Sequence, residues 1–242
     1  SFLKMQIKVA RKLDPIIVVS ENSRKDVVKD FKIDPKKTRK VLHGIDHKTF
    51  EPIPSIERKK NQLITTASAD VPLKGLIYLI RAYSELLNEF PDLSLVVIGK
   101  LRDGPTSNEL DKKDIKNKVK FISDLTSREI AELYAESTIA ISPSVYEGFG
   151  FPAGEAMSCG IPLISTNGGS LPEVVGDSGI IVPHSNPNEL RKAIKELLLS
   201  PEKRKELGEK GRKRVLEKFT WKRAAKELVE VYREAISNAD NR

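Results

Sequence analysis

Short apolar runs rich in β-branched residues alternate along this chain with longer segments whose apolar residues recur at helical spacing. Such an alternation of strands and amphipathic helices predicts a parallel sheet that is covered by helices on both faces. We therefore expect an α/β fold with a doubly wound sheet. The expected strands are 16–20, 62–68, 93–98, 119–123, 138–142, 162–166 and 180–182. The expected helices are 3–13, 23–31, 73–89, 127–136, 152–158, 171–175, 187–199, 201–219 and 221–237.

Length and composition describe an ordinary globular protein. The 242 residues suffice for one large domain or for one and a half average ones. No apolar run approaches the roughly 20 residues of a membrane span, and no signal peptide is visible. The single cysteine, Cys159, excludes an internal disulfide, and we expect it to be a buried, inert thiol in a reducing, cytoplasmic setting. Because the chain starts with Ser1 and a helical pattern follows at once, we expect a piece of a longer polypeptide.

The net charge of +8 is concentrated at the two ends of the chain. Residues 1–50 carry 13 basic and 6 acidic groups, and residues 201–242 carry 13 basic and 8 acidic groups. The C-terminal basic residues alternate with glutamates, which is typical of a solvated helix. Peripheral contact with an anionic membrane surface is the alternative. Nucleic-acid binding is disfavoured, because aromatic residues are not interleaved with the basic ones.

A glycine-rich loop between two glutamates is the strongest functional signal. Glu147 and Glu155 flank Gly148-Phe149-Gly150, at the point where an expected strand passes into an expected helix. Glycines allow a ligand to approach the backbone, and a helix N-terminus offers free N–H groups. The carboxylates can accept hydrogen bonds from hydroxyls. This combination suits an anionic ligand that also carries hydroxyls, and a sugar nucleotide has both features.

Further blocks along the chain match one family pattern in order. They are Val18 to Ser23, His43 to Asp46, Phe50 to Pro52, Leu73 to Gly75, Val96 to Gly99, Glu147 to Glu155, Asn167 to Gly169, Pro172 to Glu173, and Phe219 to Trp221. With these blocks the chain resembles the C-terminal half of family-4 retaining glycosyltransferases. That family has the glycosyltransferase-B fold, in which two Rossmann-like domains face each other across a cleft. The resemblance therefore implies that the doubly wound sheet is Rossmann-like.

The resemblance assigns roles to the most prominent polar residues. It places Lys74 on the donor diphosphate, Glu147 on the donor sugar and Glu155 on the ribose hydroxyls. A fixed cation at the diphosphate stabilises the charge that develops on the leaving group, so Lys74 and Glu147 are the expected catalytic residues. The backbone of Gly148, Phe149 and Gly150 is expected to face sugar and phosphate.

The resemblance places the remaining donor contacts at other strand ends. Gly99, Lys100 and Leu125 are expected near the nucleobase, and Lys100 is as well explained as a plain surface residue. The family often has Gly-Arg some five positions before the lysine, whereas Ala67-Ser68-Ala69-Asp70 stands in that place in this chain. Ser68 can donate a hydrogen bond but brings no charge. There is no Asp-x-Asp motif and no metal-ligand spacing of histidines, so we expect no metal and no cofactor beyond the nucleoside-diphosphate sugar, which is the donor substrate.

The resemblance also predicts the domain organisation. Residues 1–50 would be the end of an N-terminal acceptor domain with the inter-domain segment. Residues 51–220 would be the nucleotide-sugar-binding domain, and residues 221–242 a helix that returns to the N-terminal domain. The expected partners are the donor and an N-terminal domain, without which the chain would bind donor but transfer no sugar. A non-catalytic sugar-nucleotide-binding subunit is the alternative function, followed by a basic nucleic-acid or membrane-surface binding protein.

Overall fold

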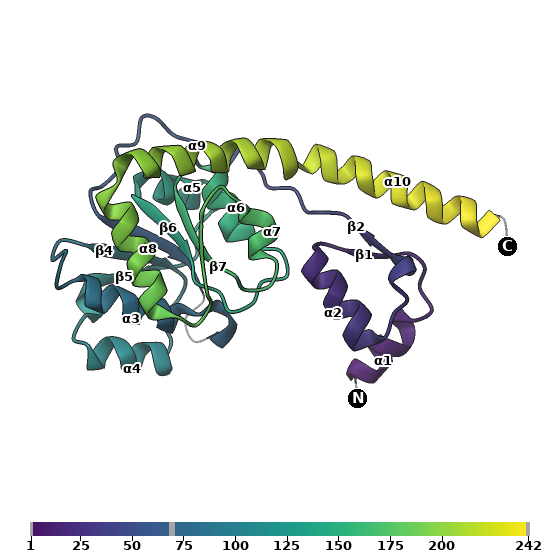
Figure 1. Cartoon of the computed structure of the whole chain (residues 1–242), viewed down its shortest axis with the longest axis horizontal. Coiled ribbons are helices and arrows are strands. Elements are labelled where there is room, and N and C mark those ends of the chain that lie inside the picture. The colour runs from purple at the N-terminus through teal and green to yellow at the C-terminus, as the bar shows by residue number, and fades with distance from the viewer. Residues whose placement is uncertain (1, 68–70, 241–242) are drawn as a thin grey trace.

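A six-stranded parallel sheet forms the centre of the molecule (Figure 1). The structure, a computed structural model, describes residues 2–67 and 71–240. The strand order is β5-β4-β3-β6-β7-β8, and every neighbouring pair is parallel. The strands are β3 (Gln62–Thr66), β4 (Ser94–Ile98), β5 (Val119–Ile122), β6 (Ile139–Ser142), β7 (Leu163–Thr166) and β8 (Ile180–Val182). All six were predicted from the sequence, because each is a short apolar run followed by loop-forming residues.

Helices cover both faces of the sheet, which confirms the predicted doubly wound α/β architecture. One face buries side chains of α3 (Leu76–Leu86), α4 (Pro105–Lys112) and α8 (Pro187–Leu199). The other face buries α5 (Ser127–Glu136), α6 (Phe151–Ser158), α7 (Leu171–Val175) and α9 (Pro201–Lys218). Leu63 belongs to the first apolar cluster and its neighbour Ile64 to the second, as the alternation of side chains along a strand requires.

A small unit, residues 2–40, lies beside the large unit that contains the sheet (Figure 1). It consists of α1 (Phe2–Ala10), β1 (Ile16–Val18), α2 (Glu21–Phe31), the 3-10 turn η1 (Pro35–Lys37) and β2 (Thr38–Lys40). The first strand, β1, lies within the segment 16–20 that the sequence predicts as a strand. It is paired within the chain, since β1 and β2 form a parallel two-stranded sheet.

Helices α3 and α4 differ most from the sequence prediction. The predicted helix 73–89 is interrupted, because Gly75 has a positive φ of 63° and separates the 3-10 turn η2 (Pro72–Lys74) from α3. Helix α4 was not predicted, because it is short and begins with a Gly104-Pro105 pair that looks like a turn. Another 3-10 turn, η3 (Lys116–Lys118), leads into β5.

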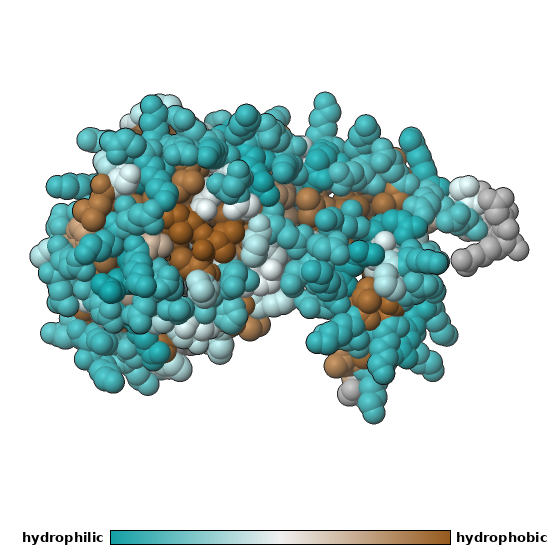
Figure 2. All heavy atoms as spheres, viewed as in Figure 1, coloured by the Kyte–Doolittle hydropathy of each residue, from teal (hydrophilic) through white to brown (hydrophobic). Residues whose placement is uncertain are grey.

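The last helix, α10 (Trp221–Asp240), extends away from the sheet and passes the small unit (Figure 1). An ion pair joins Arg39 of β2 to Glu234 of α10. Trp221, Val229, Tyr232 and Ile236 of this helix are exposed, and apolar side chains gather beneath α10 in Figure 2. No helix among residues 2–67 and 71–240 is long and apolar enough to cross a membrane.

Candidate functional site

The candidate site lies where the strand order changes direction. From β3 the sheet grows towards β4 on one side and towards β6 on the other. Loops at the carboxyl ends of two such strands diverge, and the crevice between them is the usual ligand site of a doubly wound sheet. Lys74 follows β3, and Glu147 and Glu155 follow β6. The topology therefore brings together the residues that are predicted to contact phosphate, sugar and ribose.

Lys74 and Glu147 face each other across this crevice. The Lys74 Nζ lies 2.7 Å from Oε1 of Glu147, whose side chain is only 13% exposed. The Ser144 hydroxyl donates to the same carboxylate oxygen at 2.8 Å. The lysine is brought this close by Gly75, since a Cβ at Gly75 would lie 2.1 Å from the carbonyl oxygen of Pro143. The loops after β3 and β6 are thus packed backbone against backbone.

The carbonyl groups of the glycine loop are all occupied. The Ser170 amide donates to the Glu147 carbonyl at 2.9 Å, and its hydroxyl lies 2.9 Å from that oxygen and 2.8 Å from the Phe149 carbonyl oxygen. The Gly150 carbonyl accepts the first helical bond of α6, from Gly154. Serine at position 170 gave no signal in the sequence, because its acceptors are main-chain groups more than twenty residues away.

The N–H groups of the same loop are left available. In the part of the chain that the structure describes, none of the amides of Gly148, Phe149 and Gly150 donates a hydrogen bond. Gly150 has a positive φ of 102° and is the N-cap of α6, so these donors continue into the positive end of that helix. A loop with its acceptors bound and its donors free is built to receive an anion.

Glu155 is a largely buried carboxylate in the second turn of α6. No side chain or amide among the described residues donates to it, and burial raises its pKa from 4.5 to about 7. The Tyr134 hydroxyl, close enough to feel its charge, lies 3.0 Å from Thr66 Oγ1 at the end of β3. A buried carboxylate without a donor of its own is a ready acceptor for hydroxyl groups of a ligand.

The remaining predicted residues line the β4 and β5 ends of the same sheet edge. The Gly99 amide donates to the Ile122 carbonyl at 2.7 Å, which ties the two strand ends together. Lys100 Nζ pairs with Asp124 at 2.9 Å, and both side chains are mostly exposed. Leu125 is partly buried and packs against the apolar cluster beneath. Ser68 lies outside the described residues.

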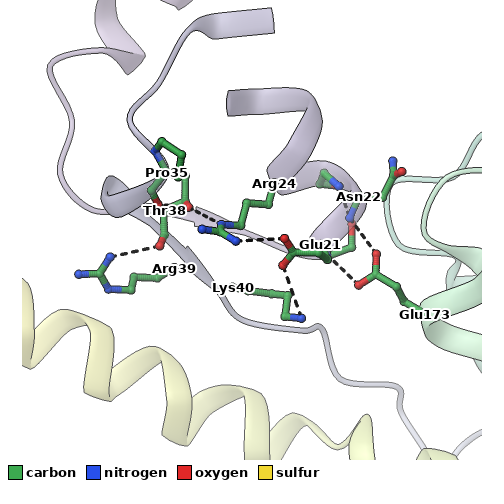
Figure 3. A network of polar contacts seen from close by, with 10 residues as sticks. Glu21, Asn22, Arg24, Pro35, Thr38, Arg39, Lys40 and Glu173 are labelled. Carbon is green, nitrogen blue, oxygen red and sulfur yellow. Dashed lines mark hydrogen bonds and ion pairs between the residues drawn. The ribbon is translucent and has the colours of Figure 1, made fainter. Parts of the chain in front are cut away.

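The small unit reaches the glycine loop, which the sequence did not predict. The hydroxyls of Ser20 and Ser23 each lie 3.0 Å from the Gly148 carbonyl oxygen. The Glu173 carboxylate accepts hydrogen bonds from the amides of Glu21 and Asn22, at 2.8 Å each (Figure 3). Contacts between residues so far apart in sequence leave no local pattern.

Other features of the large unit lie away from this crevice. A groove of about 860 Å³ runs along α9 at the opposite edge of the sheet, and no predicted site residue lines it. Cys159 is buried, as expected, and burial raises its thiol pKa to about 12. The described residues contain no group of His, Cys, Asp or Glu that could hold a metal ion.

Comparison with known proteins identifies the family of the chain. The model of the family described as "Glycosyl transferases group 1" matches residues 48–214. The chain is 39% identical over 240 residues to the MMP alpha-(1->4)-mannosyltransferase of Mycolicibacterium hassiacum, covering 98% of this chain and 58% of that protein. It thus spans little more than half the length of this curated relative.

Solved structures agree as well. The C-terminal domain of the glycosyl transferase group 1 family protein LpcC from Francisella tularensis superposes with a TM-score of 0.64 at 25% identity. The match covers 73% of this chain and 99% of that domain. Anabaena Alr3699/HepE, solved in complex with UDP and glucose, gives a TM-score of 0.84 at 20% identity over 95% of this chain and 66% of its own, and this supports the fold. The chain therefore belongs to the group 1 glycosyltransferase family, and it corresponds to the C-terminal half of the glycosyltransferase-B fold.

Proposed function

We propose that this chain is the donor-binding half of a retaining glycosyltransferase that moves a sugar from a nucleoside-diphosphate sugar to a hydroxyl acceptor. The observation that carries the proposal is the glycine loop, whose carbonyls are bound while the amides of Gly148, Phe149 and Gly150 donate to no acceptor within residues 2–67 and 71–240. Such a loop beside Lys74 offers a diphosphate both N–H donors and a positive charge.

The roles of the three charged residues follow from their surroundings. When the donor binds, Lys74 leaves its ion pair with Glu147 or shares it, and its ammonium stabilises the charge that develops on the departing diphosphate. Glu147, held by Ser144, remains oriented to accept from sugar hydroxyls. Glu155 accepts from the ribose diol, since a buried carboxylate gains most from paired hydroxyl donors.

The nucleobase is proposed to lie over the ends of β4 and β5, against Gly99 and Leu125. The family resemblance suggests that the base is read there mostly through main-chain groups. Lys100 is held in a surface pair with Asp124 and has only a secondary role there. The proposed chemistry uses no metal, because the Lys74 ammonium and hydrogen bonds from the loop amides stabilise the negative charge of the diphosphate.

The acceptor side of the site is proposed to come from an N-terminal domain of the kind that the longer relatives contain. We expect the 242-residue chain by itself to bind donor and to transfer no hexose. The names of the relatives suggest which donors to try first. One relative is a mannosyltransferase, and one solved neighbour was crystallised with UDP and glucose.

Isothermal titration of the 242-residue chain with UDP, GDP, ADP and TDP, and with GDP-mannose and UDP-glucose, tests the proposal. We expect one nucleoside diphosphate to bind more tightly than the others, and Glu155→Ala to weaken that binding. As the matched control, Glu202→Ala replaces a glutamate in the first turn of α9, far from the crevice. Absence of binding by every nucleotide would overturn the donor assignment.

A further inference from the structure

We propose that Ser20 and Ser23 are positioning residues for the glycine loop, and that Glu173 holds them in place by capping the helix that carries Ser23. The proposal deepens the proposed function, on which it rests for the identity of the ligand. It makes the donor pocket of the large unit dependent on a contact with the small unit.

The two hydroxyls act on one peptide group. Ser20 and Ser23 Oγ each lie 3.0 Å from the Gly148 carbonyl oxygen and 2.8 Å from one another. Each hydroxyl has one proton, so when one serine donates to the other, the second serine can still donate to the carbonyl. The carbonyl of Gly148 and the amide of Phe149 belong to the same planar trans peptide and point in opposite directions. Holding the carbonyl towards the small unit therefore aims the Phe149 N–H away from it, as a free donor.

This restraint matters because Gly148 has no side chain that would limit its backbone angles. Gly148 can adopt a wide range of backbone angles, so its peptide plane rotates easily unless something holds it. A Cβ at Gly148 would meet nothing closer than the Ser23 hydroxyl at 4.0 Å, so the loop has room there. Hydrogen bonds, rather than packing, fix this peptide.

Glu173 fixes the position of the serines. Its two carboxylate oxygens accept from the amides of Glu21 and Asn22 at 2.8 Å each, at the N-terminus of α2 (Figure 3). Helix α2 has eleven residues, and Ser20 is its N-cap, accepting the Ser23 amide at 2.9 Å. A carboxylate at this end of a helix satisfies orphan amides and interacts favourably with the helix dipole. Glu173 itself belongs to α7 of the large unit.

Side-chain contacts join α2 to β2 around this contact. Arg24 donates to Thr38 at 2.8 Å and pairs with Glu21 at 3.0 Å, which links α2 to β2 (Figure 3). Lys40 of β2 approaches the same glutamate at 3.8 Å. Loss of the Glu173 cap would therefore release α2 together with both serines, and the Gly148 peptide would lose its orientation.

Amide NMR of the ligand-free chain tests the coupling directly. Glu173→Gln retains the shape of the side chain and removes its charge and one acceptor. We expect the Glu21 and Asn22 amide resonances to shift, and the Phe149 resonance to shift with them. Ser23→Ala should shift Phe149 while Ser20 keeps its cap, and Ser23→Thr, which retains a hydroxyl, should restore the wild-type position. Glu202→Gln, in the first turn of α9, is the matched control and should leave all three unchanged.

Titration with the tightest-binding of UDP, GDP, ADP and TDP then measures the consequence. The loss of a hydrogen bond predicts roughly three- to tenfold weaker binding for Ser23→Ala and for Glu173→Gln. An unmoved Phe149 resonance in both variants would overturn the positioning role, whether or not a nucleotide binds. A shifted resonance with unchanged affinity would overturn its link to the donor. If the wild-type chain binds none of the four nucleotides, the proposed function fails. The NMR result still shows whether the serines orient the Phe149 amide.

Discussion

Replacing Glu155 by glutamine should make the ligand-free protein more stable at neutral and alkaline pH while impairing nucleotide binding. Burial raises the pKa of Glu155 from 4.5 to about 7 in the folded chain. Between these values the folded state holds a proton that the unfolded state has lost, so the free energy of unfolding falls as the pH rises. Above about pH 7 the folded carboxyl is ionised, and the full free-energy cost of burying its charge lowers the stability. Near about pH 5 the folded carboxyl is neutral, and the cost is small.

The size of the effect follows from the pKa difference. One pKa unit corresponds to about 1.4 kcal/mol, which gives about 3 kcal/mol at most for this carboxyl. Contact of the group with solvent reduces that figure, and we expect ~2 kcal/mol. Urea unfolding of the wild type and Glu155→Gln across about pH 5 to 8 measures it, because other titrating groups are common to both proteins.

We expect the two proteins to be nearly equal in stability near about pH 5, and the glutamine variant to be more stable by ~2 kcal/mol near pH 8. Titration calorimetry in buffers of different ionisation enthalpy adds a second readout. If ribose hydroxyls bind the ionised carboxylate, nucleotide binding to the wild type releases a proton near neutral pH, and binding to the variant does not. A stability difference that is constant with pH would refute the reasoning about burial. Equal proton release by both proteins would refute the ribose assignment.

Two further changes probe the crevice, and a third probes the packing of α9 at the other edge of the sheet. Lys74→Met should weaken nucleoside-diphosphate binding by about ten- to a hundredfold and spare the nucleoside, as calorimetry would show; equal losses for both ligands would contradict a phosphate contact. Gly75→Ala should lower the free energy of unfolding by about 2–4 kcal/mol in urea, because its Cβ meets the Pro143 carbonyl at a positive φ; a neutral result would contradict this packing. Arg212→Met should lower the free energy of unfolding in urea by about 3 kcal/mol, because Nη1 donates to several carbonyls, including that of Phe50. Arg212→Lys should not restore the stability, and full restoration would show that charge alone suffices.

The sequence was sufficient for the central sheet and for the expectation that the candidate site residues share one edge of it. Each strand of the large unit is a short apolar run that ends in glycine or polar residues, and that pattern is local. Helix α6 was predicted almost to the residue, because Pro152 lies near its start and Gly160 follows its end. Once the strands are parallel, the residues that follow them must share one edge, which is why Lys74 and Glu147 could be expected to meet.

What escaped prediction depends on contacts between distant residues. The three residues of β2 form a strand only because β1 lies beside them. The helix expected at 73–89 is broken at Gly75 because the neighbouring loop leaves no room for a side chain, and no propensity describes that loop. The serines that hold the glycine loop donate to main-chain carbonyls, which are the same in every sequence.

The glycines at the crevice fix its backbone geometry, whereas exposed side chains nearby do not. Besides Gly75, Gly168 and Gly169 also touch main chain, since added Cβ atoms would lie 2.4 Å and 2.3 Å from the carbonyl oxygens of Ser144 and Glu147. A side chain at any of these three glycines would therefore collide with main chain, so we expect a substitution there to destabilise the fold. Lys100, by contrast, is mostly exposed in its pair with Asp124, so its side chain can be changed without disturbing this packing. Redesign towards another nucleotide can accordingly be confined to such exposed side chains, while the three glycines are kept unchanged.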